Sequence, residues 1–459
     1  MEKTDVLVIG SSAAGLVAAL TAKRVYKDKK VTVVRKEEKT LIPCGIPYVF
    51  GSVDSTDNNI LPSDKMFSEA GIELQIGEAV SINRENKTCK LQSGSEIGYE
   101  KLVLATGSTP AKPDWLKGAQ LENVYTVPKD KNYLDSMQEK LKSHKKVVVV
   151  GGGFIGVEIS DELNKAGKDV TLVEILPHVL ELAFDEDIAV KAENILIDRG
   201  VKVLGGNGIK EIFGAQNVEG VLLNNGVKLE ADAVILAMGY KPNTKLAKEA
   251  GLPLSAKNFI ITDEYMRTED TNIFAIGDCA EKRDFVTRKP SSVMLASTAC
   301  AEARIAGMNL FKLSAVKTFS GTISIFSTAI GDTGFGVAGL TETKARQEGF
   351  DIVCGEFEGI DRHPGTLSDT QKQMVKLVVG KETGIILGGE VIGGKSVGEL
   401  TNMIGFIIQN RMDINAILTS QIGTHPLLTA SPAGYPLLKA AGNAAVQIMF
   451  NNKEGRLSA

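Results

Sequence analysis

Cys44 is the residue best suited to covalent chemistry, because it lies in the turn-forming segment Pro43-Cys44-Gly45-Ile46-Pro47-Tyr48. Proline favours the first turn of a helix, and a thiol at a helix amino terminus has a lowered pKa and more reactive thiolate. The next cysteine is Cys89, so Cys44 has no neighbour for an internal disulfide. Two oxidised forms remain open, a mixed disulfide with a small thiol and a sulfenic acid formed by peroxide. The alternative is a small buried residue, the common fate of cysteine.

The remaining cysteines are interpreted as structural. Cys89, Cys300 and Cys354 lie in runs typical of core strands or helices, and Cys279, which directly follows Asp278, is expected to pack in the interior as well. Five cysteines spread over 459 residues cannot form a dense disulfide framework, and in a reducing compartment they are thiols.

Two glycine-rich turns repeat one design, in which an apolar strand precedes the turn and a helix and a second apolar strand follow it. The turns are Gly10-Ser11-Ser12-Ala13-Ala14-Gly15 after strand 6–9, and Gly151-Gly152-Gly153-Phe154-Ile155-Gly156 after strand 147–150. In the second turn, Gly151 permits the sharp bend, Gly153 lets the backbone approach a pyrophosphate and Gly156 lets helix and strand pack closely. The phosphate then lies on helix N–H groups. Two such units predict two dinucleotide sites, and the alternative is a pair of structural turns in an α/β protein.

The two units differ at the end of their second strand. Glu174 ends this strand in the second unit, where a carboxylate accepts hydrogen bonds from a ribose diol and repels a 2′-phosphate, which predicts NADH rather than NADPH. Arg35 has the corresponding position in the first unit, and Ser12 replaces the middle glycine. Either Glu37 or Glu38 is an alternative ribose ligand there, and the sequence leaves this open.

Three further apolar strands end in small residues or a carboxylate. Ala105-Thr106-Gly107 and Ala237-Met238-Gly239 each form a small-x-Gly turn, and Gly277-Asp278 follows the strand that starts at Ile273. Ligands of open α/β sheets bind at the carboxyl ends of strands, so Asp278 is predicted to bind a sugar-like polyol. The alternative for Asp278 is an ordinary helix cap.

Length and composition bound the class of protein. A chain of 459 residues is long enough for about three domains, and a net charge of −4 with a pI of 5.8 argues against a nucleic-acid partner. No apolar run reaches the ~18 residues needed to cross a bilayer, and no signal-peptide core precedes strand 6–9, so we expect a cytoplasmic protein without a membrane partner. We expect no metal site.

These features together resemble the pyridine nucleotide–disulfide oxidoreductases over essentially the whole chain. The resemblance implies an α/β fold with two Rossmann-like domains, for FAD and NAD, and a C-terminal α+β dimerisation domain. The implied order is FAD-binding residues 1–113, NAD(P)H-binding residues 114–250, FAD-binding residues 251–324 and dimerisation residues 325–459. It also implies a homodimer in which the partner's C-terminal domain completes the active site.

The resemblance assigns cofactor contacts to the glycine turns and strand ends. It implies FAD contacts for Gly10, Ser12, Ala13, Ala14, Gly15, Arg35, Ala105, Thr106, Gly107, Gly277 and Asp278. It implies NAD(P)H contacts for Gly151, Gly153, Phe154, Ile155, Gly156, Glu158, Glu174 and Gly239. Phe154 would cover the nicotinamide pocket and Glu158 would lie near flavin and nicotinamide; core packing and a solvated helix carboxylate are the respective alternatives.

The single cysteine followed by Gly-Ile-Pro-Tyr is similar to the coenzyme A-disulfide reductase, NADH oxidase and persulfide reductase branch of the family. Members similar to glutathione reductase carry two cysteines instead. The resemblance implies that NADH reduces FAD, which then reduces an oxidised Cys44. The acceptor is expected to be a small disulfide or persulfide, with coenzyme A favoured as a substrate or a Cys44 adduct. The alternatives are an NADH oxidase or peroxidase acting on O2 or H2O2, and a redox-sensing flavoprotein.

Four more residues are candidates through the same resemblance. Lys23 and Arg24 resemble basic residues that bind coenzyme A phosphates, although a charged helix end is usually just solvated, and Tyr48 is a candidate substrate contact. His363 and His425 lie where relatives usually carry tyrosines near the active cysteine, and His425-Pro426 is similar to the pair whose histidine, from the partner subunit, protonates the leaving thiol. The alternative for both histidines is a structural role. With the sequence ending at residue 459, we expect no fused rhodanese-like module.

Overall fold

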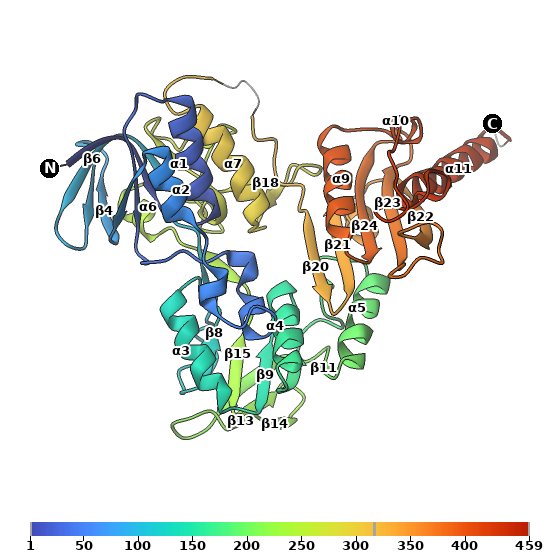
Figure 1. Cartoon of the computed structure of the whole chain (residues 1–459), viewed down its shortest axis with the longest axis horizontal. Helices are drawn as coiled ribbons and strands as arrows, with labels where there is room; N and C mark the ends of the chain where they lie inside the picture. Colours follow the sequence, from blue (N-terminus) through green and yellow to red (C-terminus); the bar gives the residue numbers. More distant parts are fainter. Residues whose placement is uncertain (1, 315–317, 458–459) are drawn as a thin grey trace.

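The computed structural model describes residues 2–314 and 318–457, which form three lobes of α-helices and β-sheets (Figure 1). Two lobes are built on mainly parallel sheets, and the third is built on an antiparallel sheet. Within the described residues, no helix combines the length and the apolar composition needed to cross a bilayer.

The first lobe is a seven-stranded sheet with helices packed against it. Its elements are β1 (Glu2–Ile9), α1 (Ala13–Val25), β2 (Val31–Arg35), α2 (Ser63–Ala70), β3 (Glu73–Ile76), β4 (Ala79–Asn83), β5 (Thr88–Leu91), β6 (Glu96–Leu104), α6 (Lys245–Glu249), β17 (Ile273–Ala275) and α7 (Ala296–Met308). The strand order is β3-β2-β1-β6-β5-β4, and β17 also pairs with β6. Val6–Ile9 of β1 is buried, because parallel pairing with β2 and β6 on both sides puts this strand in the centre of the sheet.

The second lobe repeats this arrangement on a five-stranded parallel sheet, with a three-stranded antiparallel sheet beside it. Its elements are β8 (Val124–Thr126), α3 (Lys131–Lys142), β9 (Lys146–Val150), α4 (Phe154–Lys165), β10 (Asp169–Val173), α5 (Glu186–Asp198), β11 (Lys202–Leu204), β12 (Ile209–Phe213), β13 (Gly220–Leu223), β14 (Lys228–Glu230) and β15 (Ala233–Leu236). The parallel order is β11-β10-β9-β15-β8, so β9 is central as β1 is in the first lobe. The chain passes between the two lobes through the antiparallel pair β7 (Ser108–Pro110) and β16 (Tyr240–Pro242).

The third lobe is a five-stranded antiparallel sheet in the order β20-β21-β24-β23-β22 with helices against it. Its elements are β20 (Phe326–Ile330), β21 (Thr333–Gly339), α8 (Glu342–Gln347), β22 (Ile352–Ile360), β23 (Lys372–Gly380), β24 (Ile386–Gly393), α9 (Val397–Gln409), α10 (Ile414–Leu418), η5 (Pro432–Gly434) and α11 (Pro436–Leu457). Helix α9 packs on β21 and β24, and α11 packs on β22 and β23.

The segment that carries Cys44 leaves the first lobe after β2 and packs on the second. It forms three short 3-10 helices, η1 (Pro43–Gly45), η2 (Pro47–Phe50) and η3 (Thr56–Asn59). Figure 1 shows this blue segment over the end of the second lobe that carries α3 and α4. Apolar residues of the segment and of the second lobe form one buried cluster, which includes Leu41, Ile46, Val49, Phe50, Leu134, Met137, Val157 and Ile159.

Candidate active site

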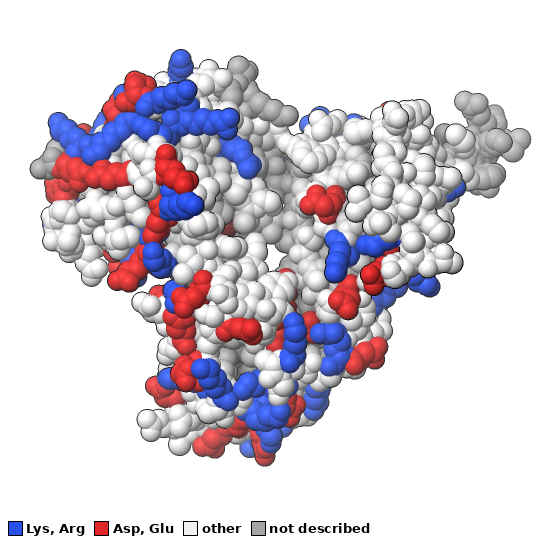
Figure 2. Space-filling view, in the orientation of Figure 1, with Lys and Arg blue, Asp and Glu red and all other residues white. Residues whose placement is uncertain are grey.

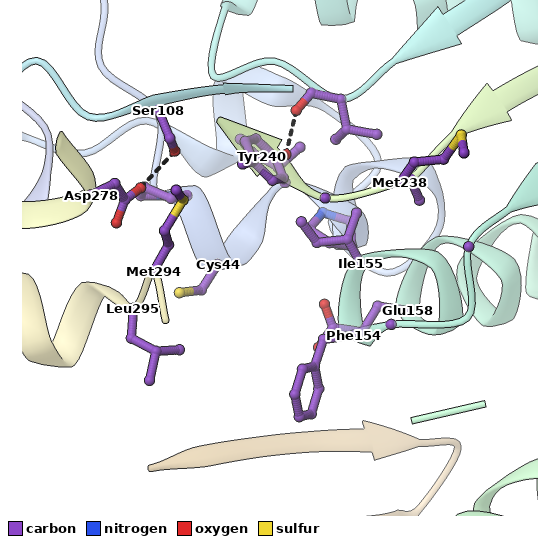
Figure 3. Close-up of a pocket in the computed structure, with 18 of the residues that line it drawn as sticks. Cys44, Ser108, Phe154, Ile155, Glu158, Met238, Tyr240, Asp278, Met294 and Leu295 are labelled. Carbon is purple, nitrogen blue, oxygen red and sulfur yellow. Dashed lines mark hydrogen bonds between the residues drawn. The ribbon is translucent and has the colours of Figure 1, made fainter. Parts of the chain in front are cut away.

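A cavity of about 1260 Å³ lies where the three lobes meet, and both glycine turns line it. Its wall includes Ser12, Ala13 and Ala14 from the first turn and Gly151, Gly153, Phe154 and Ile155 from the second. Cys44 and Asp278 line the same cavity, together with Ile325, Phe326 and Asn402 from the third lobe or the chain just before it. Figure 3 shows the Cys44 side chain pointing into the open centre, with Asp278 and Met294 on one side and Phe154 and Glu158 across from it.

The two glycine turns have the same geometry. Gly10 and Gly151 have φ values of 107° and 110°, a region that favours glycine. A Cβ atom at Gly10 would collide with the carbonyl of Ala105, and one at Gly151 would collide with the carbonyl of Ala237. The strand ends after β6 and β15 therefore press against equivalent turns, which explains why both end in a small residue.

Both turns leave room for a phosphate above a helix amino terminus. No described atom lies within 4 Å of the point where a Cβ atom on Gly153 would be. In the described part of the chain no side chain caps α1 at Ser12 or α4 at Gly153. The free N–H groups of the first turn of each helix are thus available to an anion. The residues present fit a dinucleotide diphosphate at both turns.

Glu174 lies at the edge of the second turn as a fixed carboxylate. It lines the cavity and is 8% exposed. One carboxylate oxygen accepts a hydrogen bond from the Leu176 N–H at 2.8 Å, and the other accepts one from the Gly152 N–H. Because a carboxylate has about four acceptor sites, Glu174 can still accept hydrogen bonds from a ligand hydroxyl.

Asp278 lies in η4 (Gly277–Cys279) at the end of β17 and is held by groups from two other segments. The Ser108 hydroxyl donates to it at 2.7 Å, and the Lys129 ammonium lies 2.9 Å from the same oxygen. Burial by itself raises the pKa of Asp278, but Lys129 and the Ser108 hydrogen bond outweigh burial and hold this pKa below its ordinary value. The carboxylate is therefore ionised at the cavity wall. Sequence reasoning missed Lys129, since its charged surroundings, Lys129-Asp130-Lys131, are typical of a solvated surface.

Cys44 is exposed, and its local structure differs from the expectation. It lies in the three-residue helix η1, which is too short to supply a helix dipole, so the prediction of a helix beginning at Cys44 is wrong. Burial of the thiol and the negative charge of Glu158 raise the pKa of Cys44, and Lys129 opposes them. The protein groups around Cys44 therefore raise its thiol pKa, and a lowering of this pKa by an adjacent oxidised flavin stays a prediction.

Glu158 lies where helix α4 meets two other segments. It projects from α4, and the Thr328 hydroxyl of β20 donates to it at 2.8 Å. Tyr48 of the cysteine segment lines the same cavity. Burial raises the pKa of Glu158 to about 7, although the Thr328 hydrogen bond opposes the shift. Burial and Glu158 also raise the pKa of Tyr48.

Phe154 stacks on an aromatic ring from the third lobe. Its ring centroid lies 5.0 Å from that of Phe326 with an interplanar angle of 9°, and 6.1 Å from that of Phe184 in an edge-on arrangement. Phe154 and Phe326 both line the cavity (Figure 3 labels Phe154). This position is compatible both with a role in core packing and with a ring that covers a nicotinamide pocket.

Several candidate residues lie behind the cavity wall or away from it. Gly10, Gly15 and Gly156 shape the turns from behind, and Thr106 donates to the Asn243 carbonyl at 2.6 Å. Arg35 is buried and makes an ion pair of 2.5 Å with Asp64, which lowers the pKa of Asp64 to about 2. The guanidinium of Arg35 is thus satisfied by protein groups.

Lys23 and Arg24 lie at the carboxyl end of α1, outside the cavity wall. Lys23 donates to the carbonyls of Lys27 and Lys29 at 3.0 and 2.9 Å, which satisfies backbone groups just beyond the helix. Arg24 is exposed. Figure 2 shows basic side chains gathered over this edge of the first lobe, with acidic side chains close by.

The two candidate histidines lie together on the third lobe and outside the cavity of their own chain. The His363 ring nitrogen lies 3.1 Å from the Thr429 carbonyl, and the His363 N–H donates to the Pro426 carbonyl at 3.4 Å. His425 is exposed, and the neighbouring Leu427 and Leu428 are 58% and 69% exposed.

Two dinucleotide-type turns meet at one cavity, an arrangement typical of an oxidoreductase that uses a nicotinamide and a second dinucleotide. The chain belongs to the pyridine nucleotide-disulphide oxidoreductase family, which matches residues 4–303. Residues 325–433 match the dimerisation domain of this family, which indicates a homodimer.

Similar proteins include both NADH oxidases and persulfide reductases. An NADH oxidase of Methanocaldococcus jannaschii is 31% identical over 453 residues, covering 95% of this chain and 98% of that protein. An NAD(P)H coenzyme A polysulfide/persulfide reductase of Pyrococcus horikoshii is 30% identical over 96% of this chain and 98% of that protein. The structure of an NAD-dependent persulfide reductase from A. fulgidus is 30% identical, with a TM-score of 0.88 over 98% of this chain and 84% of that one.

These comparisons confirm the predicted family, the predicted fold class with a dimerisation domain, and the predicted class of enzyme. The protein is an oxidoreductase that uses NAD(P)H and a flavin.

Proposed function

We propose that this protein is an FAD-dependent, NADH-preferring reductase of small disulfides or persulfides, and that Cys44 carries the acceptor sulfur. The observation that carries the proposal is the exposed Cys44 thiol, which faces a cavity lined by two glycine turns. Cys44 is a free thiol and has no cysteine neighbour in sequence, which supports a disulfide partner supplied by a substrate.

FAD is proposed to lie on the first turn, with its diphosphate on the amino terminus of α1 and its polyol chain at Asp278. The ionised Asp278 accepts hydrogen bonds from hydroxyl groups, and Lys129 fixes its orientation. When bound, the flavin would take hydride from the nicotinamide and supply two electrons to sulfur at Cys44. With this assignment, the FAD-binding domain is proposed to comprise residues 1–113 and 251–324, the NAD(P)H-binding domain residues 114–250 and the dimerisation domain residues 325–459.

NADH is proposed to lie on the second turn, with its diphosphate at Gly153 and its adenosine ribose at Glu174. The Gly152 and Leu176 N–H groups hold the Glu174 carboxylate at the cavity wall, where it repels a 2′-phosphate. Phe154 covers the nicotinamide side of the cavity.

Cys44 cycles between a mixed disulfide and a thiolate. Reduction of Cys44–S–S–R by two electrons breaks the S–S bond, leaves Cys44 as a thiolate and releases R–S⁻, which takes up one proton to become R–SH. We propose that the partner subunit's His425 gives this proton, because His425 lies on an exposed face of the dimerisation domain and outside its own chain's cavity. His363, bonded to the Thr429 carbonyl, supports this loop.

Coenzyme A is the favoured thiol. Arg24 is exposed at the carboxyl end of α1 and offers a cation to a phosphate, with Lys23 beside it. Tyr48, four residues after Cys44, lines the cavity that the thiol would enter.

The test is steady-state turnover of the purified flavoprotein with coenzyme A disulfide, NADH and NADPH. The proposal predicts rapid NADH consumption, slower NADPH consumption and loss of disulfide turnover in Cys44→Ser. Release of coenzyme A from Cys44 by a reductant, seen as a mass loss, is the matching direct observation.

The second candidate is an NADH oxidase that reduces O2 or H2O2, and the similarity to the M. jannaschii NADH oxidase favours it. NADH consumption with O2 alone that survives Cys44→Ser would replace the first proposal with this one. No turnover with any small acceptor would favour a redox-sensing flavoprotein.

A further inference from the structure

The segment that carries Cys44 contains little regular secondary structure, and a backbone hydrogen bond between Ile42 and Asn59 joins its two ends. Helices η1 and η2 are single 3-10 turns of three and four residues, which contain few hydrogen bonds of their own. The rest of the segment packs on α3 and α4 of the second lobe, through η3 and η2 respectively. The contacts with those helices therefore determine where the thiol lies.

One carboxylate of α4, Glu162, makes two of these contacts. It accepts a hydrogen bond from the Ser52 N–H and a second, of 2.8 Å, from the Ser52 hydroxyl. Lys165, one turn further along α4, donates to the same hydroxyl at 2.7 Å. Glu162 is only 5% exposed, so water competes poorly for these hydrogen bonds.

Backbone hydrogen bonds connect Ser52 to η2 and the turn that contains Cys44. The N–H groups on either side of Ser52, those of Gly51 and Val53, both donate to the Tyr48 carbonyl, at 3.3 and 2.8 Å. Gly51 lies so close to α4 that a Cβ atom there would be 2.7 Å from the backbone oxygen of Glu162. A shift of Ser52 would therefore move η2 and, with it, the turn that holds Cys44.

Helix α4 thus acts on the segment at two positions that are one turn apart. Burial and the charge of Glu158 raise the pKa of Tyr48, and Glu162 is hydrogen bonded to Ser52. The same helix begins at Phe154, which lines the nicotinamide side of the cavity. Glu158 faces the cavity, whereas Glu162 lies outside its wall.

We propose that Glu162 is a positioning residue for Cys44, which fixes the thiol relative to the dinucleotide turn at the start of α4. This inference rests on the proposed function of Cys44. Glu162 touches neither substrate nor cofactor in this assignment, so its effect reaches the thiol only through Ser52 and η2.

The experiment compares Glu162→Ala with Asp161→Ala in the flavin-loaded protein. Asp161 is the adjacent residue of α4, is also 5% exposed and is also bonded, but to Arg199 and Gly331, away from the cysteine segment. Two rates are measured: kcat with coenzyme A disulfide, and the rate of Cys44 alkylation by iodoacetamide, resolved by peptide mass spectrometry across pH 6–10.

Glu162→Ala should lower kcat for the disulfide about tenfold, the smaller end of the loss expected for a buried hydrogen bond to a charged group, with KM for NADH unchanged. It should also speed alkylation of Cys44, because a freed segment loses the burial and the Glu158 charge that raise the thiol pKa. Glu162→Gln retains a carbonyl for the Ser52 N–H and should restore kcat to within about threefold of the parent protein. Ser52→Ala, on an exposed loop, should give an intermediate loss.

Alkylation of the buried Cys89 and Cys279 reports general unfolding and should stay unchanged in all variants. Equal kcat and equal Cys44 alkylation in Glu162→Ala and Asp161→Ala would overturn the inference. So would faster alkylation at Cys89 and Cys279 together with Cys44. Loss of the proposed function is a separate result, in which Cys44→Ser retains disulfide turnover.

Discussion

Replacement of Glu158 by glutamine should make the protein more stable at neutral and alkaline pH. Burial raises the pKa of Glu158 to about 7 from an ordinary value of 4.5. Between these two pH values the folded protein retains a proton that the unfolded chain has lost, so the stability that Glu158 contributes falls as the pH rises. A difference of 2.5 units corresponds to about 3 kcal/mol, which is fully expressed above pH 7 and absent below pH 4.5.

Glu158→Gln removes this titration and should therefore gain up to about 3 kcal/mol over the parent protein between pH 4.5 and pH 8. The assay is urea denaturation of both proteins at pH 4.5, 6, 7 and 8, with the difference in free energy of unfolding plotted against pH. Thr328→Val should instead lower the free energy of unfolding relative to the parent protein as the pH rises. Loss of the hydroxyl that donates to Glu158 raises the carboxyl pKa further, so stability falls more steeply with pH.

The same substitution has a chemical readout at Cys44. The Glu158 charge raises the pKa of the thiol, so Glu158→Gln should lower that pKa and speed alkylation at a fixed pH near 8. A flat difference in unfolding free energy across the pH range, with Cys44 alkylation unchanged, would refute the reasoning, since it would mean that Glu158 is ionised in the folded protein at pH 5.

Two further substitutions test the third lobe. Lys376→Met removes the cation that lies 2.8 Å from the buried carboxylate of Asp185 and 3.0 Å from the half-buried carboxylate of Glu342, and it should cost about 3–5 kcal/mol in urea denaturation. Lys372→Met on the same strand, in a pair 82% and 53% exposed, should cost under about 0.5 kcal/mol. Equal losses in the two variants would contradict this. His425→Ala should slow release of the thiol about 10²-fold without loss of flavin absorbance, and mixing it with Cys44→Ser should restore activity in hybrid dimers; unchanged disulfide turnover would remove His425 from the mechanism.

Short-range features of the site could be read from the sequence because they depend on the local backbone. A glycine turn between a strand and a helix is specified within six residues, and Gly10 and Gly151 adopt the same φ for this reason. Asp278 was found because a strand end marks its position. These signals do not depend on any distant part of the chain.

The charges and hydrogen-bond partners that surround each site residue could not be predicted from the sequence. The lowered pKa of Cys44 assumed a helix, but Pro43–Gly45 forms one 3-10 turn, and burial beside Glu158 has the opposite effect on the thiol. Arg35, expected near a cofactor, is paired with Asp64. Lys129 and Thr328, which hold Asp278 and Glu158, have no motif in the sequence.

The sequence by itself determined the two glycine-turn units, the candidate cysteine without a neighbour in sequence and the family, since each follows from residue types at fixed local spacing. Only the tertiary structure decided which charges surround Cys44 and which helix contacts its segment, because Glu158 acts on the thiol and Glu162 is hydrogen bonded to Ser52 from another lobe. Electrostatic and hydrogen-bond energies depend on distance in space and on burial, and neither is encoded by separation along the chain.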